Sequence, residues 1–312
     1  MEQSTESDFA GIVTNERVLH MEEDRYRPGH IIYADQYALK TSDGTNTSIV
    51  AGSPTENNYR EAVGIDSRFE IIRGFAQVAD GRIIVADTGN NCLRQVNRTS
   101  DVTSVFSGPC KASRYRGKSE VPLNSPWSVI VDNQNSSQLL FADHYNYVVK
   151  SVEISTGVVS NFSRQEKNQE PKYYVVTYMA QDTNGDIFIT GYNAIYRIAY
   201  DERTIQHISG SSRHSGYRDS TLLNSLYDRI TDLAFIGPRT FLVVEERLRL
   251  VHTNSNRVTT VDRRVSYEFL WRCKWGSMCR RHPHPESLLA TNNSLYVGLL
   301  GRIKRYKCEL QS

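Results

Sequence analysis

The sequence predicts an all-β fold, namely a six-bladed β-propeller built from four-stranded antiparallel blades. Three observations support this prediction: a pattern of paired apolar strands recurs six times, the copies are roughly 50 residues apart, and no amphipathic helical pattern interrupts the series. A unit of that length accommodates four short strands and their turns. One such sheet cannot bury both of its faces alone, so the units must pack side by side around an axis.

Each copy contains two apolar strands separated by an acidic or small polar residue and a tight turn. The pairs lie at residues 31–39, 83–96, 139–152, 187–198, 241–251 and 295–306. A further apolar strand precedes each pair, as at 127–131, and another follows it, as at 102–106. We therefore expect one domain over residues 1–312, with blades at residues 16–52, 66–108, 122–163, 173–210, 226–262 and 285–308.

The two ends of the chain complement each other. The sixth copy ends at Cys308 with no outer strand after it, and the apolar segment at residues 9–14 has no unit before it. We expect segment 9–14 to supply the missing strand of the last blade and so to close the ring. A closed ring leaves no strand edge open to pairing with another molecule.

The charge composition excludes a general electrostatic attraction to nucleic acid or to anionic membranes. The chain has 37 Lys and Arg residues against 35 Asp and Glu residues, a net charge of +2. No stretch approaches about 18 consecutive apolar residues, so no transmembrane helix is expected. The first residues lack the basic and apolar segments of an export signal, and we expect the chain to be a mature or partial form of an exported protein.

Two features indicate an oxidising, extracellular environment. Cys92 and Cys110 bracket one expected hairpin, Cys273 and Cys279 bracket a short loop, and neither pair has the spacing of a structural zinc site. We expect both pairs to form disulfides, which leaves Cys308 unassigned. Glycosylation sequons are present at Asn46, Asn97, Asn135, Asn161 and Asn292. The protein is expected to be secreted or displayed on the cell surface, as a monomer or as part of a longer ectodomain.

Residues 85–94, VADTGNNCLR, resemble the core motif of the NHL repeat. Residues 141–146, FADHYN, resemble it less closely, residues 33–35 less closely again, and the last three copies keep only the strand pattern. The resemblance covers residues of about 10–308 and implies a propeller of the extracellular NHL type. In the motif, we expect Asp87 to begin a tight turn and to accept backbone N–H groups there. We expect Gly89 to supply a positive φ, which the following Asn residues also tolerate.

The pattern of histidines does not indicate a catalytic metal site. A related propeller family, the peptidyl-hydroxyglycine lyases, uses central zinc-binding histidines, which requires about three of them on innermost strands. In this chain no histidine is expected on an innermost strand. His144 falls in a turn, His207 on an outer strand and His252 at a strand end.

Three aspartates offer a weaker alternative, a central calcium site of the lactonase kind. Asp132, Asp182 and Asp232 recur at steps of 50 residues at the ends of expected innermost strands. They could ring the centre of the propeller, or each could start a turn, and we expect the second role. No catalytic residue, metal ion or cofactor is therefore predicted.

Tyr–Arg pairs recur in the connections between blades. In a propeller, these connections and the turns between the two middle strands emerge on one face, which we call the loop face. Its candidate binding residues are Arg60, Tyr115, Arg116, His144, Tyr145, Tyr192, Tyr217 and Arg218. Tyrosine and arginine combine a large contact area with directed donors, which suits recognition of a protein or a glycan. The Tyr–Arg pairs could instead pack one blade onto the next.

These features favour a recognition module that binds an extracellular protein or glycan, and not an enzyme. Two alternatives stay open. One is a metal-dependent propeller enzyme, lyase-like or lactonase-like, with a site at the centre of the ring. The other is a cytosolic RNA-binding NHL propeller that uses the basic C-terminal third of the chain. In that region Arg247 and Arg249 alternate along one expected strand, which is typical of a solvated blade edge, so nucleic acid is not expected as a partner.

Overall fold

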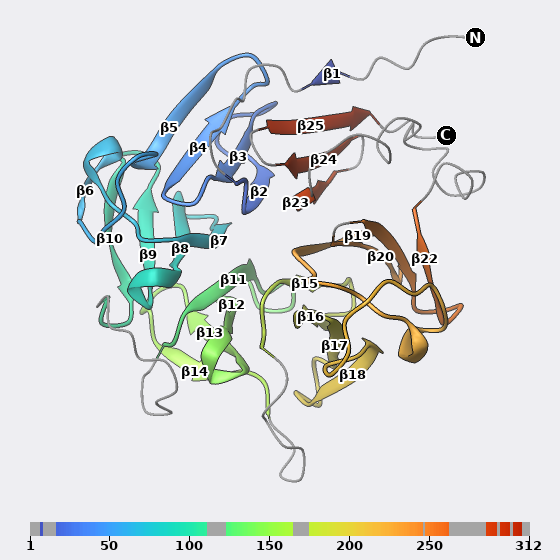
Figure 1. The fold of residues 1–312 in the computed structure, drawn as a ribbon. Coiled ribbons are helices and arrows are strands. Elements are labelled where there is room, and N and C mark those ends of the chain that lie inside the picture. Colours follow the sequence, from blue (N-terminus) through green and yellow to red (C-terminus); the bar gives the residue numbers. More distant parts are fainter. Residues whose placement is uncertain are drawn as a thin grey trace.

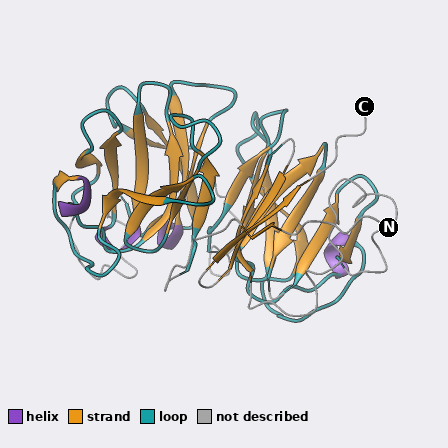
Figure 2. Cartoon of the chain, turned by 90° about the horizontal axis from the view of Figure 1, so that it is seen from above, coloured by secondary structure: helices purple, strands orange, loops and turns teal. Residues whose placement is uncertain are grey.

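The computed structural model describes residues 7–8, 17–110, 123–164, 175–245, 247–261, 285–291, 294–299 and 302–307. These residues form antiparallel sheets arranged around a common centre (Figure 1). Strands dominate, and helix is present in these ranges only as short 3-10 segments (Figure 2). The predicted class, an all-β propeller with four-stranded antiparallel blades, is confirmed.

The sheets follow one another along the chain, and β2, β7, β11, β15, β19 and β23 lie nearest the centre (Figure 1). The first sheet contains β2 (His20–Glu23), β3 (Ile31–Ala34), β4 (Ala38–Ser42) and β5 (Thr47–Gly52). The second contains β7 (Ile72–Gln77), β8 (Arg82–Asp87), β9 (Cys92–Asn97), β10 (Val102–Ser107) and β6 (Ala62–Val63). The third contains β11 (Pro126–Val131), β12 (Gln138–Asp143), β13 (Val148–Glu153) and β14 (Val159–Asn161).

The second half of the chain repeats this arrangement. The fourth sheet contains β15 (Met179–Gln181), β16 (Ile187–Thr190), β17 (Ala194–Ile198) and β18 (Ile205–Gly210). The fifth contains β19 (Asp232–Gly237), β20 (Thr240–Val244), β21 (Leu248–His252) and β22 (Arg257–Thr260). The last contains β23 (Pro285–Ala290), β24 (Ser294–Leu299), β25 (Arg302–Lys307) and β1 (Ser7–Asp8). The 3-10 segments are η1 (Gly64–Asp66), η2 (Thr88–Asn90), η3 (His144–Asn146) and η4 (Leu222–Asn224).

In the part of the chain that the structure describes, five sheets have four strands, rather than the six four-stranded blades that the sequence predicts. The second sheet has a fifth strand, because β6 pairs with β10, with Val63 opposite Val102 and Ala62 opposite Thr103. The connection at residues 53–71 passes along the outer edge of this sheet before it returns to the centre at β7. Two of its residues can therefore continue the hydrogen-bond ladder.

Closure by an N-terminal strand stays a prediction, since residues 9–14 lie outside the described residues. Immediately before that segment, the two-residue strand β1 pairs antiparallel with β25. Ser7 lies opposite Arg305, and Asp8 lies opposite Lys304.

The hydrophobic core lies between neighbouring blades. In β8, Ile83 and Val85 pack with residues of β3 and β4 in the first sheet, whereas Ile84 and Ala86 pack with residues of β11 and β12 in the third. All four side chains are fully buried. Successive residues of a strand point to opposite faces. Because the next blade covers each face, the strand is apolar at every position instead of alternating with polar residues.

The disulfide predicted between Cys92 and Cys110 is present. Cys92 begins β9 and Cys110 follows the end of β10, so the bond ties the third strand of the blade to the exit of the fourth. Cys273, Cys279 and Cys308 lie outside the described residues.

Removing this disulfide should destabilise the fold. The sequence separation of its cysteines is 18, and closing a loop of that size lowers the entropy of the unfolded chain, which stabilises the fold by about 3 kcal/mol. The double replacement Cys92→Ala with Cys110→Ala should therefore lower the free energy of unfolding by about 2–4 kcal/mol, as measured by urea titration. An unchanged unfolding midpoint, or free thiols at both cysteines in the native protein, would contradict this expectation.

The motif aspartates begin their turns as predicted, but the expectation that their carboxylates accept backbone N–H groups of those turns is wrong. Oδ1 of Asp87 accepts the backbone N–H of Glu70 at 3.0 Å, in the connection that enters the blade. Its Oδ2 accepts Nδ2 of Asn90 in η2 at 2.8 Å. Asp143 repeats the arrangement by accepting the backbone N–H of Asn124 at 2.6 Å. Each carboxylate therefore fixes a middle turn against the connection beside it.

The role predicted for Gly89 is also wrong. The residue with a positive φ in this turn is Asn91, at 56°, and Tyr147 takes the same conformation in the third blade at 59°. Glycine is required at position 89 for a different reason, because a Cβ atom there would lie only 2.5 Å from Cγ of Glu70.

Candidate functional site

The middle turns and the connections between blades meet on one face, which is the geometry expected for the loop face. In the second blade, Nδ2 of Asn90 donates to the carbonyl oxygen of Asn58 in the connection, at 3.2 Å. In the fourth blade, the carbonyl oxygen of Tyr192 accepts the N–H of Ile230, at 2.7 Å, just before β19. The innermost strands all begin at this face, because each one follows such a connection.

Three of the predicted candidates come together on the loop face, near the beginning of β11. The ring centroids of His144 and Tyr145 are 4.4 Å apart, and those of His144 and Tyr192 are 6.2 Å apart. His144 also packs against Trp127, the second residue of β11, at 4.3 Å. Tyr178, which directly precedes β15, meets Trp127 edge-on at 6.2 Å.

Arg73, the second residue of β7, completes this group. Its guanidinium carbon lies 4.5 Å from the centroid of the Trp127 ring, in cation–π geometry. We call the group of Arg73, Trp127, His144, Tyr145, Tyr178 and Tyr192 the axial cluster, since three consecutive innermost strands contribute to it. It extends from the core to the surface, because His144 is fully buried and Tyr192 is 49% exposed.

His144 is held in its neutral form. Its Nδ1 lies 3.0 Å from the carbonyl oxygen of Val176, and because a carbonyl oxygen can only accept, Nδ1 carries the proton. Burial lowers the pKa of His144 to about 4, and the nearby charge of Arg73 lowers it further, against the raising effect of the Val176 bond. The second ring nitrogen, Nε2, is therefore a hydrogen-bond acceptor.

Three buried polar atoms of the axial cluster have no hydrogen-bond partner in the part of the chain that the structure describes. They are Nε of Arg73, Nε1 of Trp127 and Nε2 of His144. Buried polar atoms in native proteins are seldom left unpaired. The cluster therefore combines two donors and one acceptor with several aromatic faces.

His20 contradicts the expectation that no histidine lies on an innermost strand, because it begins β2. Its ring meets Phe75 at 4.8 Å, and its Nε2 lies 3.6 Å from Oε1 of Glu22. Burial lowers the pKa of His20, but Glu22 and Asp232 outweigh that effect, so that its pKa lies above the ordinary value. Within the described ranges, however, no group of three or more His, Cys, Asp and Glu side chains is placed to hold a metal ion.

The three recurring aspartates do not ring the centre. Asp232 begins β19, whereas Asp132 and Asp182 follow the ends of β11 and β15 on the opposite face. The carbonyl oxygens of Asp132 and Asp182 accept turn hydrogen bonds from Asn135 at 3.2 Å and Gly185 at 3.1 Å. The expected role as a turn starter therefore holds for two of the aspartates and is wrong for Asp232.

Buried arginines anchor two of the Tyr–Arg connections. Nη2 of Arg94, in β9, donates to the carbonyl oxygen of Arg60 at 3.1 Å, and Nη2 of Arg249, in β21, donates to that of Arg218 at 3.0 Å. The backbone of each connection is thus fixed, while the side chains of Arg60 and Arg218 are exposed. Tyr217, which precedes Arg218, is half-buried. Tyr115 and Arg116 lie outside the described residues.

The burial of Arg249 corrects the interpretation of its strand as a solvated edge. Arg247 is exposed, but Arg249 is fully buried. Nη1 of Arg249 lies 2.6 Å from Oε1 of Glu245, and its Nη2 lies 2.8 Å from Oδ1 of Asp219. This arginine therefore holds the blade together and is not available to a polyanion.

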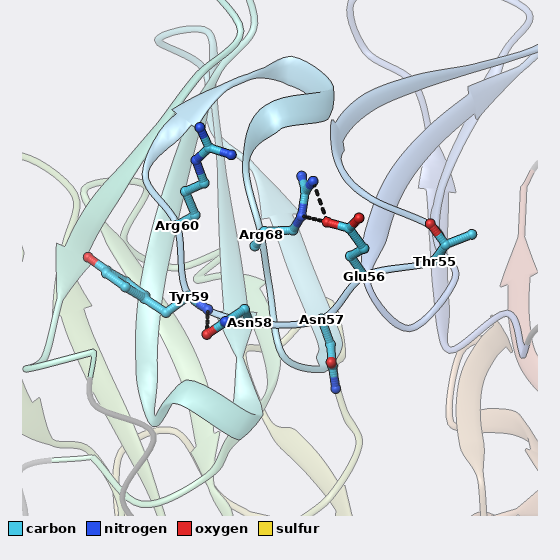
Figure 3. A pocket seen from close by; sticks show the side chains of 7 residues that line it. All are labelled: Thr55, Glu56, Asn57, Asn58, Tyr59, Arg60 and Arg68. Atoms are coloured by element: carbon cyan, nitrogen blue, oxygen red, sulfur yellow. Dashed lines mark hydrogen bonds and ion pairs between the residues drawn. The ribbon is translucent and has the colours of Figure 1, made fainter.

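A pocket of about 540 Å³ lies in the connection between the first two blades (Figure 3). It is lined by Thr55, Glu56, Asn57, Asn58, Tyr59, Arg60 and Arg68. Glu56 neutralises Arg68, accepting its Nε at 2.9 Å and its Nη2 at 2.7 Å. Arg60 is exposed at this wall, apart from the Glu56–Arg68 pair (Figure 3).

Three of the described sequons lie on the face opposite the loop face. Asn46 and Asn135 are in turns between the third and fourth and between the first and second strands, and Asn97 ends the third strand β9, all of which antiparallel strand order places on the opposite face. Asn161 ends the outermost strand β14, so it lies at the outer rim on the side of the loop face. Asn46, Asn97 and Asn161 are exposed and Asn135 is half-buried. Asn292 lies outside the described residues.

No model of a known protein family matches the chain, and no curated protein sequence matches it. Solved structures do match it. The chain is a β-propeller. An auxiliary nutrient binding protein from Bacteroides ovatus has a TM-score of 0.67 at 12% identity, covering 95% of this chain and 70% of that one. A putative gluconolactonase has a TM-score of 0.60 at 13% identity, with coverages of 98% and 92%. Virginiamycin B lyase from Staphylococcus aureus has a TM-score of 0.59 at 8% identity, with coverages of 95% and 96%.

At such low identities the likeness concerns the propeller fold alone, and it extends to both binding proteins and enzymes. The described part of the chain contains no helix long and apolar enough to cross a membrane.

Sequence reasoning missed Arg73, Trp127 and Tyr178. Their common feature is their position within two residues of the start of an innermost strand, at steps close to the repeat length. Marking the starts of these strands, and not only their ends, would have identified all three.

Proposed function

We propose that this protein is a secreted or cell-surface recognition module, not an enzyme, that binds an extracellular protein or glycan through its loop face. The axial cluster carries the proposal, because it places aromatic and cationic side chains with unpaired polar atoms near the centre of that face. Such side chains supply most of the binding energy at recognition surfaces. The other candidates, Arg60, Tyr115, Arg116, Tyr217 and Arg218, would extend the contact outward along the connections.

The distribution of sequons supports this choice of face. Glycans at Asn46, Asn97 and Asn135 would cover the opposite face, where a partner bound on the loop face would not meet them. A glycan at Asn161 would project from the outer rim, at the end of β14. The Cys92–Cys110 disulfide fits an oxidising compartment, and the likeness to nutrient-binding propellers fits a binding role.

We also propose that the repeats are of the NHL type. The motif aspartate of the second blade forms a buried ion pair with a basic residue of the next strand, Arg94 to Asp87. The same pairing recurs between Lys40 and Asp35 in the first blade and between Lys150 and Asp143 in the third. A shared pair of this kind supports a common repeat, although the last blades lack the motif.

A binding screen with matched variants tests the proposed function. The full chain, produced through a secretory pathway, is applied to an array of extracellular proteins and glycans. We expect at least one specific ligand, and we expect Tyr192→Ala, in the axial cluster, and Arg218→Ala, farther out along a connection, each to weaken its binding by about tenfold, as for residues that contribute clearly to an interface. Thr45→Ala, in an exposed turn of the opposite face, should leave the affinity unchanged. Binding that responds to Thr45→Ala and not to the loop-face variants would contradict the proposal.

Metal analysis of the same preparation tests the enzymatic alternative. The proposal expects no stoichiometric metal ion. Stoichiometric zinc or calcium, together with a hydrolytic or lyase activity that is lost when the metal is removed, would show instead that the protein is a propeller enzyme.

A further inference from the structure

We propose that the axial cluster binds an acidic sugar, with Arg73 and Trp127 donating hydrogen bonds to its carboxylate and His144 accepting one from a neighbouring hydroxyl group. This inference rests on the proposed function, because it assigns a ligand class to the same face.

Arg73 has no carboxylate partner among the described residues. Several other arginines of the blades do have one, such as Arg82 with Asp80, Arg94 with Asp87, and Arg249 with Glu245. Among the described residues, Arg73 has only the ring of Trp127 beneath it, and its Nε lacks a partner. A guanidinium group is planar, so its donors can match the two oxygens of a carboxylate.

The second donor comes from the residue on which Arg73 stacks. Nε1 of Trp127 is a donor only, and it has no acceptor in the described part of the protein. A negatively charged oxygen at the edge of the stacked pair would satisfy both Trp127 and Arg73. Hydrogen bonds to ionised groups are stronger than those between neutral groups, so an anion gains more here than a neutral carbonyl would.

His144 distinguishes a sugar acid from a simple carboxylate. Its ring contacts Trp127 at 4.3 Å, and its Nδ1 proton is committed to Val176. Nε2 is then an acceptor without a donor. A ligand that satisfies the whole set must present a hydroxyl donor close to a carboxylate. A terminal uronic acid with a free C4 hydroxyl does so, because that hydroxyl lies beside the carbon that carries the carboxylate, whereas the side chain of an acidic peptide has no such donor.

The remaining members of the axial cluster suit a sugar ring. Tyr192 is half-exposed and Tyr145 is half-buried, and both rings face the buried His144. Aromatic rings offer flat apolar faces, which complement the C–H face of a pyranose. An extended peptide would instead need a groove or an unpaired strand edge along which to lie. The cluster is compact and belongs to three neighbouring innermost strands, so we expect it to take one terminal sugar unit.

Calorimetry with matched sugars tests the inference. The full chain is titrated with trigalacturonic acid and with a hyaluronan tetrasaccharide, and then with the carboxyl-reduced, neutral form of each. We expect at least one acidic form to bind at least tenfold more tightly than its neutral counterpart. Arg73→Gln should abolish that preference, and Trp127→Phe, which keeps an aromatic ring but lacks the N–H, should weaken it. Arg213→Gln, at an exposed loop-face position outside the cluster, should keep it.

Folding of each variant is checked by its near-ultraviolet circular dichroism and its melting temperature, which Arg73→Gln should preserve because Arg73 is only half-buried. Equal affinity for acidic and neutral sugars, a preference that survives Arg73→Gln, or selective binding of a tetraglutamate peptide would each overturn the inference. A ligand from the array screen that needs Tyr192 but not Arg73 would leave the proposed function standing and remove only this assignment.

Discussion

Replacing Arg94 with methionine should lower the free energy of unfolding by about 3–5 kcal/mol, because removing one partner of a buried ion pair leaves the other charge uncompensated. Arg94 and Asp87 are both fully buried, with Nη1 of Arg94 lying 3.2 Å from Oδ2 of Asp87. Burial raises the pKa of Asp87 to about 6, although hydrogen bonds from Asn90 and Glu70 and the charge of Arg94 oppose that rise. Without Arg94, the ionised carboxylate loses one of the groups that stabilise it.

The loss also includes three backbone contacts. Arg94 donates to the carbonyl oxygens of Arg60 and Arg68 in the connection and of Ser104 in β10, so its removal breaks three contacts that hold the connection against the blade. Urea unfolding of Arg94→Met measures the effect. Arg60→Met, at an exposed position of the same connection, is the matched control and should change stability by less than about 0.5 kcal/mol.

A double-mutant cycle isolates the ion pair. Because Asp87→Asn removes the charge that Arg94 balances, the two replacements together should cost clearly less than the sum of their separate effects. Additive losses would mean that the Asp87–Arg94 pair does not hold the blade in the way described here.

Acidification from pH 7 to pH 4 should cost about 3 kcal/mol through His144 alone, since one pKa unit corresponds to about 1.4 kcal/mol. The pKa of His144 is lowered from 6.5 to about 4 in the folded protein, first by burial and then by the charge of Arg73. The folded state therefore binds this proton more weakly than the unfolded state does. The contribution is complete above about pH 6.5 and is lost progressively as the pH falls towards 4.

Other buried groups act in the opposite direction. The pKa values of Asp87, Asp143 and His20 are raised in the folded protein, so their contributions are larger at low pH and decrease as the pH rises. The measurement is therefore the difference in unfolding free energy between the wild type and His144→Phe across this pH range. As the pH falls, the wild type should lose stability relative to His144→Phe. A difference in unfolding free energy that is independent of pH would contradict a neutral, buried His144.

Much of the fold was predictable because each blade is apolar on both faces. Strands such as β8 and β12 are uninterrupted runs of buried residues, and a sheet of that kind must lie between two others. The Cys92–Cys110 bond was predictable because both cysteines bracket one hairpin, and the loop face followed from the order of strands within a blade. The fifth strand of the second blade was not, because Ala62 and Val63 pair only where the path of a connection brings them beside β10.

The site was predictable only in part. Turn positions identified His144, Tyr145 and Tyr192, but Arg73 and Trp127 become neighbours only when two innermost strands pack against each other. The error over Arg249 has a related cause. Strand periodicity tells which face a side chain points to, whereas burial of that face depends on the connection that crosses it, here the one containing Arg218.

The central claim is recognition through the loop face. Comparing the effect of a glycan attached to the loop face with that of glycans on the opposite face tests it most directly. Arg213→Asn creates a sequon with His214 and Ser215 in an exposed stretch of the loop face, close to the Tyr192 turn because Ser211 donates to Asn193 at 3.0 Å. The account predicts that a glycan at position 213 abolishes binding of the ligand found on the array. Adding Ser215→Ala, which prevents glycosylation, should restore binding, and the native glycans on the opposite face should have no effect. Full binding with a glycan at position 213, or loss of binding caused by the native glycans, would contradict it.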